Sequence, residues 1–192
     1  MNTDLVSYYK DRATEYEKIY SKPERQDDIE QATTILQDIF NQKSVLEIAC
    51  GTGYWTERIA QTAASIYATD INESVIEIAK QKDISNNHVT FGLADINNLK
   101  LDNNVSTNGT IVFMDNNYVD GSNHPIAETD KDGNTFQVRK LENGATHLVL
   151  KNFPTQEYIS KKLSDIATDI TFINLTYYWI LSYKPNGKMK TS

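Results

Sequence analysis

The feature that most constrains the fold is a short apolar segment that ends in a glycine turn. Residues 44–50 read SVLEIAC, and Gly51-Thr52-Gly53 follow directly. After the turn, apolar residues recur with helical spacing at Trp55, Ile59, Ala60 and Ala63. We therefore predict a strand, a glycine turn and a helix, an order that is typical of α/β proteins.

The same order repeats further along the chain. Residues 65–70 (SIYATD) and 88–93 (HVTFGL) are predicted to be the second and third strands. Between them, Asn72 is suited to capping a helix whose apolar positions are Val75, Ile76, Ile78 and Ala79. Strands that alternate with helices imply right-handed crossovers and hence a parallel sheet.

Two helices are predicted before the first strand. The apolar face of the first has spacings of four, three and four, at Tyr9, Ala13, Tyr16 and Tyr20. Tyr8 and Arg12 lie off that face, so a solvated position is the simplest expectation for both. The second helix is predicted to begin at Pro23, carry apolar residues at Ile29, Ala32, Leu36, Ile39 and Phe40, and end at Asn41.

The C-terminal half follows a different pattern. Residues 95–109 are polar and show no helical period, and 110–115 (TIVFMD) are the next clear strand. An exposed loop is expected over 116–134. Two alternating runs, 135–141 and 145–151, flank Asn143-Gly144, a strong hairpin signal.

The chain is predicted to end with a helix and two strands. The helix begins at Pro154 and continues to about Ala167, and the strands lie near 169–175 and 177–183. These two strands must be antiparallel, because a parallel crossover needs a dozen or more residues.

Composition narrows the class of protein. A chain of 192 residues, 39% hydrophobic and 23% charged, is expected to form one soluble domain. The net charge is -7 and no basic stripe is present, so nucleic acid is not the expected partner. Cys50 is the sole cysteine, which favours a reducing compartment. Since neither a secretion signal nor a membrane span is apparent, we expect a cytoplasmic protein.

Two features point to a nucleotide-like ligand. The glycines let the backbone approach a ligand closely, and the N–H groups at the start of the next helix favour a negative group. Asp70 lies 19 positions after Gly51, at the end of the second strand, where a carboxylate can accept hydrogen bonds from both hydroxyls of a ribose.

The stretch VLEIACGTG (residues 45–53) resembles the first motif of the class I S-adenosylmethionine-dependent methyltransferases. The resemblance extends to Asp70, to Ala94-Asp95-Ile96 after the third strand, and to the paired C-terminal strands. It implies a Rossmann-like α/β fold, with a mostly parallel sheet, flanking helices and an antiparallel C-terminal strand. It also implies S-adenosylmethionine (SAM) as cofactor, S-adenosylhomocysteine (SAH) as product, and methyl transfer to a small molecule.

The resemblance also assigns residues to the cofactor. Glu47 and the backbone around Gly51 and Gly53 would hold the methionine part, and Asp70 the ribose. Asp95 would meet the adenine amino group between Ile71 and Ile96. Four further residues complete the expected binding set: Ala49, Trp55, Tyr9 and Tyr16. No metal site is expected.

Structural explanations remain open for several of these residues. Glu47 needs a partner whether it binds a ligand or only supports the fold, because an unpaired buried carboxylate is costly. Asp95 would also serve as a simple turn cap, and Tyr9 and Tyr16 as ordinary packing residues.

Methyl transfer from a sulfonium needs no nucleophile on the protein, but an alcohol or amine acceptor needs a base. His124 is one candidate, because its loop leaves the carboxyl edge of the sheet, and Asp115 and Asn116 are the others. His88 and His147 are expected to be structural.

The chain departs from the resembling family in one place. A complete core has a fourth strand and a further helix between the third strand and TIVFMD, where this chain has only residues 94–109. The chain is naturally shortened with TIVFMD beside the first strand, or a partner completes the sheet, or a stretch is missing from the sequence. Because an open sheet edge favours association, we expect a homodimer.

We expect a single domain over 1–192, with an N-terminal helical lid (1–43), a cofactor-binding core (44–115), and a substrate loop, hairpin and C-terminal strands (116–192). A protein that binds SAM or SAH without catalysis is the alternative function. A nicotinamide-dependent dehydrogenase fits less well, because Tyr54-Trp55-Thr56 replaces the third small residue of its glycine motif.

Overall fold

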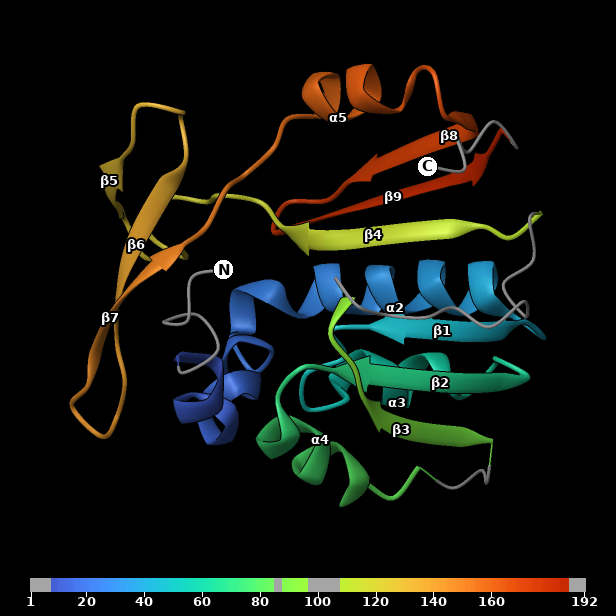
Figure 1. Ribbon diagram of the computed structural model, residues 1–192, viewed down its shortest axis with the longest axis horizontal. Helices are drawn as coiled ribbons and strands as arrows, with labels where there is room; N and C mark the ends of the chain where they lie inside the picture. The colour runs from blue at the N-terminus through green and yellow to red at the C-terminus, as the bar shows by residue number, and fades with distance from the viewer. Residues whose placement is uncertain (1–7, 85–87, 97–107, 187–192) are drawn as a thin grey trace. The chain divides into compact units, whose positions relative to one another are not determined.

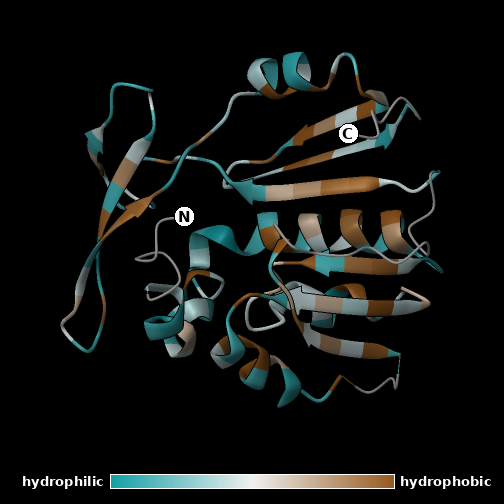
Figure 2. Ribbon diagram, viewed as in Figure 1, coloured by the Kyte–Doolittle hydropathy of each residue, from teal (hydrophilic) through white to brown (hydrophobic). Residues whose placement is uncertain are grey.

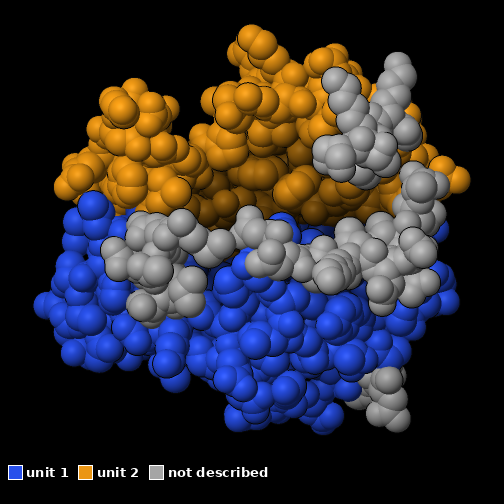
Figure 3. All heavy atoms as spheres, in the orientation of Figure 1, with its two compact units in different colours: residues 1–99, 138–149 blue, residues 100–137, 150–192 orange. Residues whose placement is uncertain are grey.

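The computed structural model describes residues 8–84, 88–96 and 108–186. The chain forms two compact units, shown in blue and orange in Figure 3. Unit 1 comprises residues 1–99 and 138–149, and unit 2 comprises 100–137 and 150–192. The division into lid, core and C-terminal part stays a prediction.

Unit 1 contains a parallel three-stranded sheet (Figure 1). Its strands are β1 (Ser44–Ile48), β2 (Ser65–Asp70) and β3 (Val89–Leu93), in the order β1-β2-β3. Helix α3 (Tyr54–Ile59) follows β1, and α4 (Glu73–Lys80) follows β2. The predicted alternation of strand and helix, and the parallel sheet, are therefore confirmed.

Helix α2 (Gln26–Phe40) precedes this sheet and buries one apolar face. A short 3₁₀ turn, η2 (Pro23–Arg25), leads into it, and Asn41 ends it, as predicted. Brown apolar segments alternate with paler ones along α2 in Figure 2. The buried apolar residues of α2, β2 and α4 are Ile29, Ala32, Leu36, Ile66, Ala68, Val75, Ile76 and Ala79.

The N-terminal segment differs from the single α-helix expected. A helical turn over residues 8–11 is followed by the 3₁₀ helix η1 (Ala13–Ile19). The solvated position predicted for Tyr8 is wrong, because its side chain is only 2% exposed and packs with Leu141 and Val149. Arg12 is half-buried, with its guanidinium 5.8 and 5.2 Å from the ring centroids of Tyr8 and Tyr16.

Unit 2 is built on an antiparallel sheet. Its strands are β4 (Ile111–Asn116), β8 (Ala167–Asn174) and β9 (Tyr178–Pro185), in the order β4-β9-β8. The antiparallel pairing predicted for the last two strands is confirmed. Helix α5 (Gln156–Leu163) is shorter than predicted, because β8 already begins at Ala167. The buried core of this unit comprises Leu163, Ala167, Trp179, Leu181 and Tyr183.

A third sheet has the order β5-β6-β7. Strands β6 (Thr135–Lys140) and β7 (Thr146–Leu150) form the predicted hairpin, with Gly144 at a φ of 88° in its turn. The expected loop 116–134 also contains a strand, β5 (Ile126–Thr129), which pairs with β6. All four of its residues are exposed. A strand with no buried face does not need the alternation of apolar and polar residues by which strands are predicted from sequence.

The stretch expected to lack a fourth strand falls largely on residues 97–107, outside the described ranges. In the part that the structure describes, β4 is the next strand after β3, and β1 is an edge strand of its sheet. The three explanations for the shortened region stay open.

Candidate cofactor-binding site

The segment between β1 and α3 makes a sharp bend at the carboxyl edge of the unit 1 sheet. Its backbone is left-handed at Ala49 (φ 59°), Gly51 (φ 56°) and Gly53 (φ 78°). A Cβ atom on Gly53 would lie 3.1 Å from the Cβ of Ala79, so glycine lets α4 pack directly against the bend. The bend therefore depends on glycine both for its φ angles and for its packing.

Ala49 is the one position of this bend where an L side chain occupies the left-handed region. That conformation costs an alanine about 1–2 kcal/mol, whereas a glycine there loses about 0.5–1 kcal/mol of chain entropy. We expect Ala49→Gly to raise the unfolding free energy by about 0.5 kcal/mol in urea denaturation. Ala64→Gly, at an exposed position of the same unit without positive φ, is the matched control and should be destabilising. Equal destabilisation by both changes would contradict the strain at Ala49.

Asp70 joins the end of β2 to this bend. Its side chain is 8% exposed; Oδ2 accepts a hydrogen bond from the amide of Gly51 and Oδ1 one from the amide of Asn72, both 2.9 Å long. The negative group that the Gly51 amide meets in this structure is thus the chain's own carboxylate. Because a carboxylate has about four lone-pair sites, two remain for further donors.

Glu47, in β1, has the partner that its burial requires. Thr56 donates a hydrogen bond of 2.7 Å from Oγ1 to Oε2 of Glu47. Desolvation raises the pKa of Glu47 to about 7, and the Thr56 hydrogen bond opposes that shift. The charge of Glu47 is therefore sensitive to small changes in its surroundings near neutral pH.

Cys50, inside the bend, does not have the environment of a reactive thiol. Burial raises its pKa, and the nearby carboxylates of Glu47 and Asp70 raise it further. Since the thiolate is the nucleophile, the side chain of Cys50 remains an inert thiol.

The N-terminal segment lies over the bend. A Cβ atom on Gly51 would lie 3.3 Å from Cε1 of Tyr16, so the Tyr16 ring packs against the glycine backbone. Thr52 donates a hydrogen bond of 2.6 Å to Glu17, whose carboxylate also lies 2.8 Å from Nζ of Lys82. The ring of Tyr9 is 6.2 Å from that of Tyr16. The structure thus brings Tyr16 to the glycine bend, whereas Tyr9 contacts Tyr16 and packs against the cluster of Tyr8, Leu141 and Val149.

Exposed apolar side chains mark the carboxyl ends of the three parallel strands. Ile71, after β2, is 40% exposed, and Ile96, after β3, is 64% exposed. Asp95 is half-buried beside Ile96. Sequence reasoning missed Ile48 and Leu93, the last residues of β1 and β3, which are also exposed. Their position at the ends of parallel strands was the signal that could have identified them.

Trp55 lies in an aromatic cluster with Tyr20 and Tyr54. The rings of Tyr20 and Tyr54 stack with centroids 3.8 Å apart, and Trp55 meets both edge-on. The guanidinium of Arg58 lies 3.6 Å from the Tyr54 centroid. Tyr20, Tyr54 and Arg58 were not predicted at this site, because aromatic spacing alone does not separate a cluster from ordinary packing.

The candidate catalytic residues lie in unit 2. Asp115 is paired with Lys151, whose Nζ is 2.6 Å from both carboxylate oxygens, and Asn116 donates two hydrogen bonds to the same carboxylate. His124 is exposed in the loop after β4. Lys151 was missed, because nothing in the sequence links it to a residue 36 positions away.

Two histidines were expected to be structural, and this stays a prediction. His88 Nε2 lies 3.1 Å from the carbonyl oxygen of Ala60, and His147 Nε2 lies 3.8 Å from the carboxylate of Asp11. Within the described ranges, no group of three or more His, Cys, Asp or Glu side chains is placed to hold a metal ion. None of the helices described is both long and apolar enough to cross a bilayer.

Comparison with known families agrees with this geometry. Residues 45–128, which include all of β1 but its first residue, the glycine bend and Asp70, match the model of a methyltransferase domain. The match covers a little less than half of the chain. It agrees with the family that VLEIACGTG and Asp70 predicted.

Among curated proteins, the malonyl-[acyl-carrier protein] O-methyltransferase of Priestia megaterium is 37% identical over 68 residues, which is 34% of this chain and 24% of that protein. The chain spans about a quarter to a third of the length of the curated relatives that it matches.

Among solved structures, two complexes of DhpI share the fold. The complex with SAH has a TM-score of 0.76 at 19% identity and covers 97% of both chains. The complex with SAM and HEP has a TM-score of 0.77 at 19% identity and covers 95% of this chain and 97% of the other. These likenesses confirm the Rossmann-like methyltransferase fold.

Proposed function

We propose that this chain transfers the methyl group of SAM to a small molecule. The observation that carries the proposal is the pair of hydrogen bonds that holds the Asp70 carboxylate at the glycine bend. Its support comes from the match of residues 45–128 to a methyltransferase domain and from the SAH and SAM complexes of DhpI, which has the same fold.

The residues present at the bend fit an adenosyl ligand. Asp70 retains lone pairs for two ribose hydroxyls, and the exposed side chains of Ile71 and Ile96 offer apolar surface to a flat ring. Asp95 lies beside Ile96 and would accept from the adenine amino group. The methionine end would be held by four residues: Glu47, Ala49, Gly51 and Gly53. The N-terminal segment, with Tyr9 and Tyr16, would form a lid.

When bound, SAM supplies an electrophilic methyl group, and its positive charge disappears during transfer. The chain's own task is then to orient the acceptor and exclude water. Asp115 and His124 are our candidates for taking up a proton from the acceptor, and Asn116 is our candidate for orienting it. Asn116 fits an orienting function because a side-chain amide is not a base. The carboxylate of Asp115 already bonds to Lys151.

Two measurements on the full chain test the proposal. Calorimetry with SAH should show binding, and methyl-labelled SAM should label at least one member of a broad panel of small-molecule acceptors. Binding of SAH without labelling over the whole panel would favour the alternative, a cofactor-binding protein without catalysis. Absence of SAH binding would overturn both. If NAD raised the melting temperature while SAM did not, the dehydrogenase reading would replace them.

The acceptor is proposed as a class only. The curated relatives are named for a malonyl group on acyl carrier protein, and this chain spans a minor part of their length. A small-molecule acceptor and a homodimer stay predictions. Size-exclusion chromatography with light scattering tests the second of these.

A further inference from the structure

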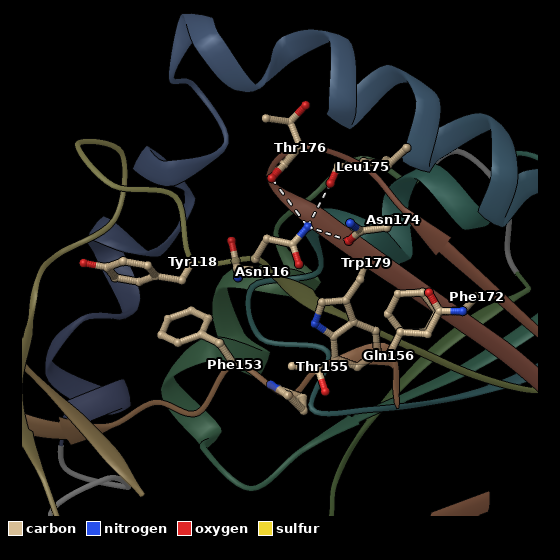
Figure 4. Close-up of a pocket in the computed structure, with 12 residues that line it drawn as sticks. Asn116, Tyr118, Phe153, Thr155, Gln156, Phe172, Asn174, Leu175, Thr176 and Trp179 are labelled. Carbon is tan, nitrogen blue, oxygen red and sulfur yellow. Dashed lines mark hydrogen bonds between the residues drawn. The ribbon is translucent and has the colours of Figure 1, made fainter. Parts of the chain in front are cut away.

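Unit 2 contains a pocket whose lining shares only Asn116 with the residues proposed for methyl transfer. Its volume is about 590 Å³, within the range of small-molecule sites, and it lies where the end of β4, the start of α5 and the turn between β8 and β9 meet (Figure 4). The residues that line it are Asn116, Asn117, Tyr118, Phe153, Pro154, Thr155, Gln156, Phe172, Asn174, Leu175, Thr176 and Trp179.

One wall of this pocket is held by a single side-chain amide. Asn117 Nδ2 donates to Oδ1 of Asn174 at 2.9 Å and to the backbone oxygens of Leu175 at 2.8 Å, Thr176 at 3.4 Å and Tyr178 at 3.1 Å. These bonds, drawn as dashed lines in Figure 4 where both residues are shown, fix the end of β4 to the β8–β9 turn. The wall is therefore formed before any ligand arrives.

Aromatic rings supply the apolar surface. Tyr118 and Phe153 meet edge-to-face with centroids 5.3 Å apart, and Phe172 stacks on Trp179 with centroids 5.7 Å apart and planes 13° apart. Flat rings on two sides of a pocket favour a flat apolar guest, because offset and edge contacts with another ring add to the burial of apolar surface.

Trp179 also brings an unpaired donor to this pocket. Its side chain is only 7% exposed, and its buried indole Nε1–H has no hydrogen-bond partner. In Figure 4 the indole nitrogen lies on the side of the ring that faces the space between Phe153 and Thr155. A buried donor without an acceptor is destabilising, so a guest that offers an oxygen there would gain a hydrogen bond at little desolvation cost.

The lining carries no formal charge. None of the twelve lining residues is acidic, basic or histidine, and the nearby Lys151 and Asp115 neutralise each other at 2.6 Å. A charged guest would lose its hydration without gaining a counter-charge. The guest that suits these walls is therefore neutral.

We propose that this pocket binds a neutral, planar aromatic molecule whose carbonyl oxygen accepts a hydrogen bond from the indole Nε1–H of Trp179. The proposal concerns residues of unit 2 alone and does not depend on SAM binding. Failure of one therefore leaves the other standing.

Benzamide is the probe, and the two indole N–H signals of the ¹⁵N-labelled full chain are the readout. The chain has two tryptophans, so Trp55→Phe assigns the remaining signal to Trp179. Benzamide is expected to move the Trp179 signal downfield along a saturable curve and to leave the Trp55 signal in place. A Trp179 signal that does not move up to the solubility limit of benzamide, or that drifts linearly together with that of Trp55, would overturn the proposal.

A charged analogue and two variants sharpen the test. Benzoate has the same ring but a negative charge, and should bind at least tenfold more weakly than benzamide; equal affinity would contradict a neutral site. Trp179→Phe, followed by saturation-transfer NMR, should weaken benzamide binding at least tenfold. If that variant does not fold, Tyr118→Ala removes an exposed wall and should weaken binding at least threefold, and unchanged affinity would count against the pocket.

Discussion

Replacing Asp70 with alanine is expected to weaken SAH binding at least tenfold, about 1.4 kcal/mol, and to lower the unfolding free energy by about 2–4 kcal/mol. The binding loss follows because the carboxylate is the proposed acceptor for the ribose hydroxyls. The stability loss follows because the amides of Gly51 and Asn72 both lose their acceptor. Calorimetry with SAH and urea denaturation measure the two effects.

A matched control separates binding from stability. Ile66 lies in the same strand, is buried, and makes no contact that the proposal assigns to the cofactor. Ile66→Ala should cost about 2–5 kcal/mol of stability through its cavity while the folded fraction binds SAH within twofold of the parent chain. If Asp70→Ala also binds SAH within twofold, the carboxylate does not contact the ribose, and Asp70 only holds the bend.

Glu47→Gln is expected to remove a pH dependence of stability worth about 3 kcal/mol. The pKa of Glu47 is raised from 4.5 to about 7 in the folded chain, so folding favours its protonated form. Its contribution is present below about pH 4.5 and is lost as the pH rises through about 7. Glutamine stays neutral throughout and retains an oxygen that can accept from Thr56.

The measurement is urea denaturation at pH 5 and pH 8 for both proteins. The variant should be more stable than the parent chain by about 3 kcal/mol at pH 8 and by no more than about 1 kcal/mol at pH 5. Glu30→Gln, on the exposed face of α2, is the matched control and should change neither value by more than about 0.5 kcal/mol. Parallel pH profiles for Glu47→Gln and the parent would contradict the raised pKa.

The part of the site that depends on local pattern was predictable. VLEIACGTG contains a strand, a bend that needs glycine and the start of a helix, and each of these is specified by neighbouring residues. Asp70 was predictable as well, because the end of the second parallel strand lies at the same sheet edge as the bend. Strand β5 was not, because its side chains are all exposed and leave no alternation to detect.

The sequence alone determined the order of strands and helices around the glycine bend, the parallel direction of the first three strands, and the carboxylate that faces the bend. Only the tertiary structure decided which residues of the site contact one another. Examples are the contacts of Thr56 with Glu47, of the Tyr16 ring with the Gly51 backbone, and of Lys151 with Asp115. In each pair the two residues are far apart along the chain or on different elements. Periodicity reports which face of an element is buried, but a contact of this kind depends on how the elements pack, and that information is not local to any segment.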